Sequence, residues 1–108
     1  MPVAEIQEVT TGEAEILTTV SGSTPKRYKV LIERVNMTAS DPNRNLLVRV
    51  NDPSLLADTG GIVQGMSGSP IIQNGRLVGA LTHVLVNDPT RGYGIFARTM
   101  LEKADSIA

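Results

Sequence analysis

"PIIQNGRLVGALTHVLV", residues Pro70 to Val86, contains the clearest β-hairpin signal in this chain. Its Asn74-Gly75 pair is the two-residue turn most typical of β-hairpins, and apolar β-forming residues flank it on both sides. We therefore predict two paired strands, 70–73 and 76–86. Gly79 within the second strand predicts a bulge or the close approach of a neighbouring backbone.

The preceding half of the chain predicts a second hairpin and a third strand. Residues 13–20 and 28–35 are rich in β-formers, and residues 21–25 between them have the composition of a turn. In 28–35 the larger apolar side chains mostly alternate, which indicates a strand with one face in the core. Residues 45–51 predict the third strand. Asp52-Pro53 then predicts a capped single turn of helix, with proline at its first position.

The remaining segments predict loops, one short strand and a terminal helix. Residues 37–45 and 87–92 have the polar, proline-containing composition of loops, and 92–97 predicts a short strand. Apolar residues at helical spacing predict a helix over 98–107. Several short strands joined by turns are typical of a mainly β barrel or sandwich, and about six strands could close a small barrel. We expect one domain spanning residues 1–108.

Composition and charge exclude several classes of function. The chain has 108 residues, a net charge of −1 and a pI near 5.7, so it lacks the basic field that attracts nucleic acid. It has no cysteine and one histidine, which excludes disulfides, thiolate metal sites and a histidine cluster within one chain. We expect no metal and no cofactor. No apolar stretch is long enough to predict a membrane span or a signal peptide.

The glycine-rich stretch "GGIVQGMSGSPIIQNG", residues 60–75, has two interpretations. The first is a simple loop that enters a buried strand, since short motifs match by accident. Alternatively, Ser67 is a nucleophile on a tight turn, which requires a base and donors for the oxyanion that forms. Glycines on both sides of the serine let the backbone turn sharply. The amide groups of Gly65 and Ser67 are then placed to form an oxyanion hole.

The hexapeptide Gly65-Met66-Ser67-Gly68-Ser69-Pro70 resembles the Gly-Asp-Ser-Gly-Gly-Pro signature of trypsin-like serine proteases, with departures at Met66 and Ser69. The longer stretch 59–93 resembles the stage IV sporulation protein B (SpoIVB) serine peptidase family, as does "NDPSLLADTGG" before it. The resemblance covers most of the chain and is strong from Asn51 onward. It implies a chymotrypsin-like antiparallel β-barrel with a short C-terminal helix, in a serine endopeptidase.

The resemblance also implies roles for individual residues. Ser67 corresponds to the nucleophile, and the amides of Gly65 and Ser67 to the oxyanion hole. The family's triad acid lies fifteen residues before its serine, which is Asp52 here. In ordinary trypsin-like proteases the acid belongs to the other barrel, and Asp52 is also the predicted helix cap. Asp58 and Asp88 are weaker candidates for the acid.

The single histidine, His83, is not the base that this resemblance implies. The family's catalytic histidine lies in the half of the peptidase domain that precedes this sequence. Aligning "GALTHV" with the strand that follows the nucleophile places Thr82 and His83 in the substrate cleft, where the backbone pairs with substrate. We therefore expect the chain to be the nucleophile-bearing C-terminal half of a peptidase domain, inactive alone.

Partners and location follow from the same resemblance. The family also carries a PDZ domain, absent here, that tethers substrate. It acts in signalling, in the extracytoplasmic space between mother cell and forespore membranes, on a regulator of a membrane-embedded metalloprotease that releases a sigma factor. We expect a protein or peptide substrate and no nucleic acid. A barrel separated from its partner exposes an apolar face, so a homodimer or strand-swapped dimer is a further expectation.

Two other functions are compatible with the residues. One is a non-catalytic β-barrel module that binds extended peptide through the strand 76–86. The other is a complete minimal hydrolase built from Ser67, His83 and Asp88, which would require these three side chains to converge.

Overall fold

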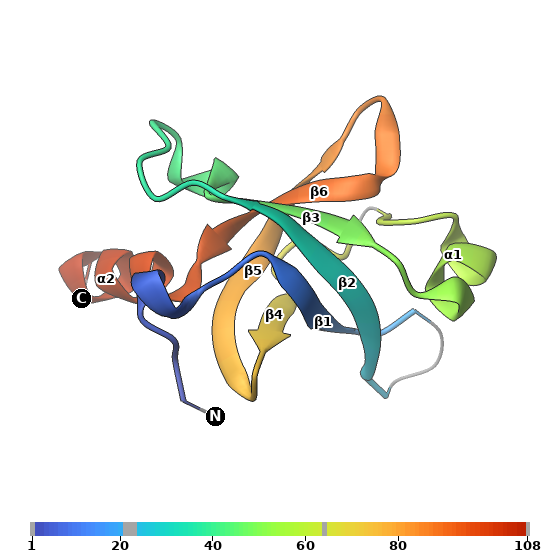
Figure 1. Cartoon of the computed structure of the whole chain (residues 1–108), viewed down its shortest axis with the longest axis horizontal. Coiled ribbons are helices and arrows are strands. Elements are labelled where there is room, and N and C mark those ends of the chain that lie inside the picture. Colours follow the sequence, from blue (N-terminus) through green and yellow to red (C-terminus); the bar gives the residue numbers. More distant parts are fainter. Residues whose placement is uncertain (1, 21–23, 64, 108) are drawn as a thin grey trace.

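The computed structural model describes residues 2–20, 24–63 and 65–107, with side chains as far as Glu102 in the last helix. The strands are β1 (Gly12–Thr18), β2 (Lys26–Val35), β3 (Leu46–Val50), β4 (Pro70–Gln73), β5 (Arg76–Leu85) and β6 (Asp88–Phe96). The helices are α1 (Pro53–Thr59) and α2 (Ala97–Ile107), with 3-10 turns η1 (Ile6–Glu8) and η2 (Pro42–Arg44) (Figure 1). Of the predicted turn 21–25, residues 21–23 lie outside the described residues.

The six strands form a closed antiparallel barrel in the order β1-β2-β3-β6-β5-β4. Alternate residues of β2 (Tyr28, Val30 and Ile32) are buried, as the alternating pattern predicts. They pack around one core with apolar side chains from each of the other five strands. The prediction of a mainly β, chymotrypsin-like barrel with a short C-terminal helix is confirmed.

The hairpin β4–β5 has the predicted turn. Asn74 and Gly75 have φ angles of 53° and 73°, so both lie in the left-handed region that a two-residue hairpin turn requires. The β4–β5 register shifts between Ile71 and Ile72, which places a bulge next to Gly79. A Cβ at Gly79 would lie 2.4 Å from the Ile95 carbonyl oxygen. Both features anticipated for Gly79 are therefore present.

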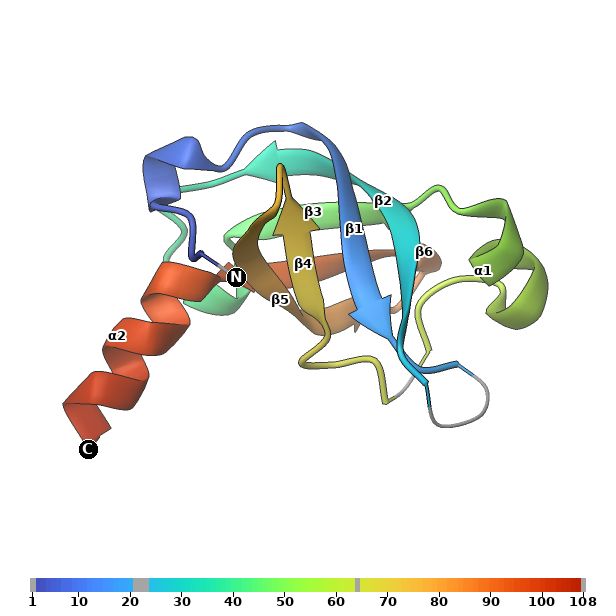
Figure 2. The same cartoon turned by 90° about the horizontal axis from the view of Figure 1, so that it is seen from below.

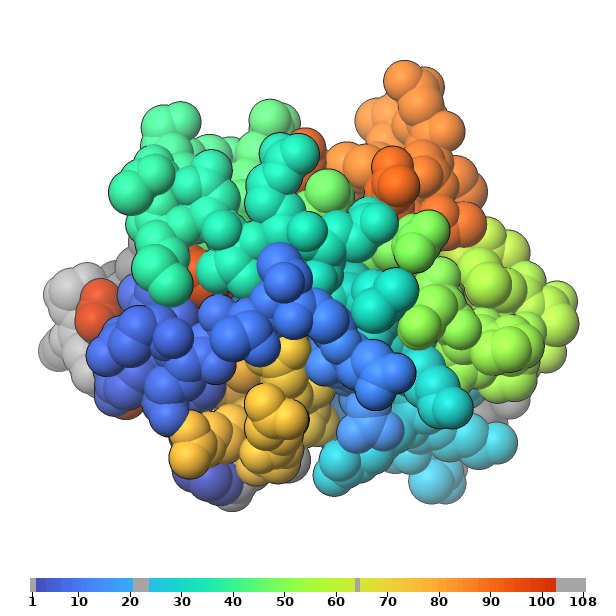
Figure 3. Space-filling model, viewed as in Figure 1, coloured from blue at the N-terminus to red at the C-terminus, as the bar shows by residue number. Residues whose placement is uncertain are grey.

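The prediction of a loop over 87–92 is wrong, because β6 already begins at Asp88. Arg91 pairs with Arg49 of β3, and the Pro89 carbonyl accepts a hydrogen bond from the Ile62 N–H at 2.7 Å. These partners lie 27 or more residues away in the sequence, so the local composition of the segment did not reveal them. Val86, at the tip of the β5–β6 hairpin, is 97% exposed, and this tip projects from the body of the molecule (Figure 3).

The two α-helices lie at opposite ends of the barrel (Figures 1 and 2). The terminal helix α2 spans Ala97–Ile107, which confirms its prediction within one residue. Helix α1 begins at Pro53 with Asp52 as its N-cap, as predicted, but it extends over seven residues instead of a single turn. Within the described residues, no helix is long and apolar enough to span a membrane.

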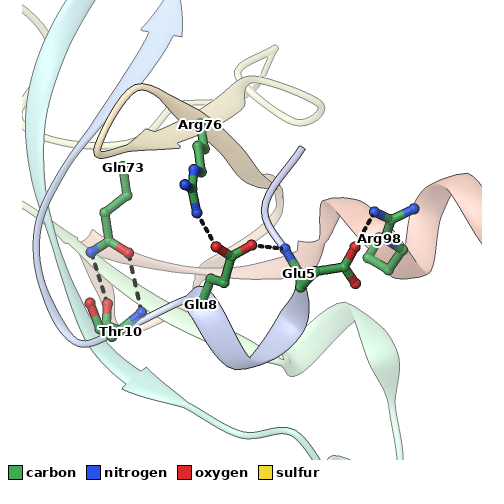
Figure 4. Close-up of polar contacts among 6 residues, drawn as sticks. All are labelled: Glu5, Glu8, Thr10, Gln73, Arg76 and Arg98. Atoms are coloured by element: carbon green, nitrogen blue, oxygen red, sulfur yellow. Dashed lines mark hydrogen bonds and ion pairs between the residues drawn. The ribbon is translucent and has the colours of Figure 1, made fainter. Parts of the chain in front are cut away.

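Residues 2–10, for which the sequence predicted no element, lie against the β4–β5 hairpin. Val3 pairs with Leu77 of β5 in a parallel bridge, and Ala4 and Val9 enter the core. Figure 4 shows the polar contacts that fasten this segment: Glu8 with Arg76, Glu5 with Arg98, and the backbone of Thr10 with the Gln73 amide. The N-terminal segment therefore links the hairpin to α2.

Candidate active site

Ser67 lies on a turn just before β4, and two flanking glycines shape that turn. Gly65 and Gly68 have φ angles of 99° and 89°, in the region that side chains rarely adopt. The Ser67 side chain between them is exposed. The spacing of glycines around this serine is thus a requirement of the backbone, and its effect is to present the hydroxyl at the surface.

The turn is fastened to the barrel through its backbone. The Gly68 N–H donates to the Leu81 carbonyl at 2.7 Å, and the Leu81 N–H donates to the Ser69 carbonyl at 3.0 Å. Met66, one of the two departures from the trypsin-like signature, is 3% exposed and belongs to the core. Apolar packing of Met66 therefore anchors the turn from inside, next to the exposed serine.

From Gly65 to Gly68, backbone N–H groups that donate a hydrogen bond alternate with N–H groups that have no acceptor among the described residues. The Met66 N–H donates to the Val63 carbonyl at 3.2 Å, and the Gly68 N–H is bonded to β5. Within the part of the chain that the structure describes, the N–H groups of Gly65 and Ser67 donate no hydrogen bond. An oxyanion hole needs two such unpaired donors. Their assignment to that hole stays a prediction.

The Ser67 hydroxyl donates to the Thr82 carbonyl oxygen at 3.1 Å. A peptide carbonyl cannot serve as a general base at neutral pH, so this contact orients the hydroxyl without activating it. His83, the neighbouring residue on β5, is exposed, and its imidazole forms no hydrogen bond with Ser67 or with any other described residue. The structure therefore gives Ser67 no bonded imidazole.

Ser67, Thr82 and His83 nevertheless line one pocket, of about 410 Å³. Its other described lining residues are aliphatic: Ile62, Val63, Leu81 and Val84. The predicted nucleophile and the two predicted cleft residues are thus brought together from the turn and from β5. Their roles in catalysis and in substrate binding stay predictions.

Strand β5 is paired differently along its length. Its first part, Arg76–Ala80, pairs with β4, whereas the strand partners of residues from His83 to Leu85 all belong to β6. The β5–β6 register shifts between Leu81 and His83, so Thr82 occupies a bulge beside Ser67. On the side of β5 that faces away from β6, the turn at Ser67 takes the place of β4 at Leu81 and Thr82, and no described strand pairs with that side from His83 to Leu85. An extended peptide can pair along such an uncovered edge.

Asp52 is occupied by structural hydrogen bonds. Its carboxylate accepts from the Ser54 N–H (3.0 Å), the Ser54 hydroxyl (2.7 Å) and the Leu55 N–H (3.3 Å) at the start of α1. It also accepts from the Lys29 N–H of β2 at 2.9 Å. The Lys29 N–H first, and then the Ser54 hydroxyl, hold the pKa of the Asp52 carboxyl below its usual value.

Asp52 does not line the pocket that contains Ser67 and His83. The structure thus shows the cap that the sequence predicted at this position and does not bring the carboxylate to the serine. The assignment of Asp52 as the triad acid stays a prediction.

The other candidate acids have local partners or none. Asp88 accepts from the Thr90 hydroxyl at 2.6 Å and from the Thr90 N–H at 3.1 Å, and it pairs with Arg91. The Thr90 hydroxyl is the main cause of a lowered pKa at Asp88. Asp58 is exposed on α1, and its carboxylate forms no hydrogen bond or ion pair with another described residue. Within these residues, no contact joins Asp88 to His83.

Sequence reasoning missed several residues that shape the site. The Thr82 hydroxyl donates to the Asn43 carbonyl at 2.7 Å, which ties the 3-10 turn η2 to the bulge of β5. The aliphatic walls at Ile62 and Val84 were also missed. The position of Val84 just after Thr82 and His83 was a usable signal, whereas nothing local pointed to Asn43. Among the described residues, no group of three His, Cys, Asp or Glu side chains could hold a metal ion.

Comparisons with known proteins agree with this architecture. The model of the family described as SpoIVB peptidase S55 matches residues 1–101. One similar solved structure is that of Rv3671c from M. tuberculosis H37Rv, a mutant with a serine replaced by alanine, in an inactive form. It superposes with a TM-score of 0.62 at 17% identity, an identity at which the likeness concerns the fold alone. The match covers 99% of this chain and 50% of that one. No curated protein matches the chain.

Proposed function

Because the chain belongs to the SpoIVB peptidase S55 family of serine peptidases, we propose that it is the nucleophile-bearing half of a serine endopeptidase. The observation that carries this proposal is the turn at Ser67, where the backbone is fixed to β5 and the exposed hydroxyl contacts only a carbonyl. The half-length match to Rv3671c supports a missing segment of similar size. That segment supplies the histidine that acts as base.

The proposed reaction assigns a step to each group. The histidine of the missing segment takes the proton of the Ser67 hydroxyl as Oγ attacks the carbonyl carbon of the scissile peptide bond. The N–H groups of Gly65 and Ser67 bind the oxyanion that forms. The same histidine then gives its proton to the departing amine, which leaves an acyl-enzyme on Ser67. Water, deprotonated by the histidine, releases the acyl group and restores the serine.

Asp52 orients that histidine in this proposal. The ordinary pKa of an aspartate is 3.8 and that of Asp52 is lower still, so the carboxylate is ionised at neutral pH, as an acid that stabilises an imidazolium must be. Its four hydrogen bonds to α1 and β2 fix the carboxylate in place. The cap and the triad acid can be one residue, because three of these bonds go to Oδ1 and Oδ2 accepts only from the Lys29 N–H among the described residues, which leaves one lone pair of Oδ2 for a histidine.

Substrate binds as an extended chain in this proposal, which makes the enzyme an endopeptidase. The uncovered side of β5 near Thr82 and His83 lies beside Ser67 and provides a pairing edge. A peptide paired there continues past the serine in both directions, so cleavage falls within the chain and not at its end.

Without the missing half, we expect this polypeptide to be inactive. Loss of one triad member leaves only the catalysis due to the oxyanion hole and binding, orders of magnitude below the complete site. We also propose that a barrel without its partner half associates as a homodimer or a strand-swapped dimer, because separation from the partner would expose an apolar face.

The family also suggests the biological setting of the intact protein. We propose a signalling protease that acts in the extracytoplasmic space between mother cell and forespore. Its substrate is a regulator of a membrane-embedded metalloprotease in sigma-factor activation, and a PDZ domain outside this chain tethers that substrate.

Labelling with a fluorophosphonate, which reacts with activated serines, tests the catalytic proposal. This chain and a longer chain that adds the N-terminal half are incubated with the probe, and mass spectrometry locates the label. We expect the longer chain to react at Ser67 at least about 1,000-fold faster than this chain. Ser67→Ala removes the reaction, whereas Ser40→Ala, at an exposed loop serine, leaves it unchanged. Equal rates in the two chains contradict the proposal.

A non-catalytic peptide-binding module is the second candidate. The uncovered edge of β5, together with a serine hydroxyl bonded to the Thr82 carbonyl, favours it specifically. The same experiment separates the two functions. A module binds extended peptides and leaves Ser67 unlabelled even in the longer chain.

A further inference from the structure

We propose that the pocket beside Ser67 selects an uncharged aliphatic side chain at the substrate residue whose carbonyl the serine attacks. This inference rests on the proposed function, since it specifies the substrate of the same site. It assigns the selectivity to Ile62, Leu81 and Val84, with Val63 at the rim.

The walls of the pocket are aliphatic on both sides. Ile62 and Val63 come from the segment that follows α1, and Leu81 and Val84 come from β5. Ile62 and Leu81 are 6% and 3% exposed, so they form the inner part of the pocket. Val63 and Val84, at 40% and 38% exposed, form its rim. A side chain that enters between them exchanges water for methyl groups, which favours an apolar occupant.

Ile62, which lines the pocket, also packs against β6. A Cβ at Gly92 of β6 would lie 2.8 Å from the Ile62 Cδ1 atom, so the isoleucine side chain packs directly over this glycine. Such a Cβ would also lie 2.8 Å from the His83 carbonyl oxygen. The absence of a side chain at position 92 thus makes room for Ile62, and the occupant meets a hydrocarbon surface there.

The pocket offers little to a charged occupant. Among the described lining residues there is no carboxylate, ammonium or guanidinium group, and the exposed His83 is the one titratable side chain. The Ser67 hydroxyl and the Thr82 carbonyl already bond to each other. A lysine or glutamate side chain would therefore lose water without a matching partner, which is costly.

The position of the pocket determines which substrate side chain binds in it. The 3.1 Å bond from Ser67 Oγ to the Thr82 carbonyl places the nucleophile against the β5 bulge, and Val84 follows two residues later. A peptide paired at Thr82 and His83 thus presents its carbonyl to Ser67 while the side chain of the same residue faces Val84 and Ile62. The selected residue is the one whose acyl group is transferred.

Binding of product-like peptides to this chain tests the inference without any catalysis. Acetyl-Ala-Ala-Leu, acetyl-Ala-Ala-Lys and acetyl-Ala-Ala-Glu, each with a free carboxylate, are titrated while NMR follows the methyl signals of Ile62 and Val84. We expect the leucine peptide to shift these signals and to bind at least about tenfold more tightly than the other two. Equal affinities, tighter binding of the charged peptides, or no shift at millimolar peptide each overturn the inference.

An acid placed at the rim sharpens the test. Val84→Asp should reverse the order, so that the lysine peptide binds more tightly than the leucine peptide. Val63→Asp, at the opposite rim, gives a second variant if the first does not fold. Val86→Asp is the matched control: it adds the same charge at a 97% exposed valine outside the pocket and should leave the order unchanged. A control that reverses the order equally well overturns the inference.

The two proposals fail in different ways. If the longer chain is labelled at Ser67 while the lysine peptide binds best, the selectivity is wrong and the peptidase assignment stands. If the leucine peptide binds in the pocket and no labelling occurs, the selectivity holds for a binding module and the peptidase assignment is wrong.

Discussion

The N-cap of α1 and the turn at Ser67 hold their polar side chains in opposite ways. Asp52 accepts four hydrogen bonds that join the helix to β2, whereas the Ser67 hydroxyl has one, to a carbonyl. The turn at Ser67 is held instead by backbone hydrogen bonds of Gly68 and Ser69 with Leu81. Hydrogen-bond donors keep a carboxylate ionised and fixed in place. A serine nucleophile instead requires a rigid backbone and a hydroxyl that is free to transfer its proton to a base.

Gly61, which lies between these two regions, should give the largest effect. A Cβ there would lie 2.4 Å from the Pro89 carbonyl oxygen, so the backbone of β6 would have to move. We expect Gly61→Ala to lower the free energy of unfolding by about 3 kcal/mol. Gly68→Ala, where a Cβ meets nothing within 4 Å but φ is 89°, should cost about 1 kcal/mol. Urea denaturation measures both, and a larger loss at Gly68 would show that the contact with Pro89 is unimportant.

Alanine substitutions at Asp52 and Ser67 should separate stability from reactivity. Asp52→Ala removes the cap and leaves the Lys29 N–H unpaired, so we expect a loss of about 1–2 kcal/mol in the free energy of unfolding. Ser67→Ala removes one exposed contact and should change that free energy by less than about 0.5 kcal/mol. It should nevertheless abolish fluorophosphonate labelling of the longer chain. Comparable losses of stability in both variants would contradict the contrast between the two regions.

The pH dependence of stability should give the smallest effect. The Asp52 pKa is lowered in the folded chain from its ordinary 3.8, because the Lys29 N–H and the Ser54 hydroxyl donate to the carboxylate. A lowered folded pKa contributes stability that is complete above the ordinary value and is lost as the pH falls through the folded one. Asp52→Asn should therefore cost more near pH 6 than near pH 2.5, as measured by urea midpoints at both pH values. A cost independent of pH would show that ionisation of Asp52 does not stabilise the fold.

Much of the barrel could be predicted from local patterns. The Asn74-Gly75 turn, the alternation in β2 and the Asp52-Pro53 cap each depend on neighbours in the sequence, and each is present in the structure. The N-terminal segment and the start of β6 were missed for the opposite reason. Their partners are distant in sequence, as with the Gln73 amide and the backbone of Thr10, 63 residues apart.

The site could be predicted only in part. The glycines around Ser67 were recognisable because a tight turn demands them, and the alignment of "GALTHV" placed Thr82 and His83 in the pocket that Ser67 also lines. The aliphatic walls were not recognisable, because Ile62 and Val84 are ordinary core-type residues until the fold sets them beside the serine. A sequence pattern could not establish the acid and the base of the triad, because a triad is defined by distances between side chains.

The distance from Ser67 Oγ to the nearest imidazole nitrogen, in a crystal structure of the longer chain, tests the central claim most directly. We predict that the hydroxyl leaves the Thr82 carbonyl and lies about 3 Å from a histidine of the N-terminal half. The contrary result is a hydroxyl that keeps its bond to Thr82 with no imidazole in reach, or one that bonds to His83. Either would show that this chain is not the half of a serine peptidase that receives its base from outside.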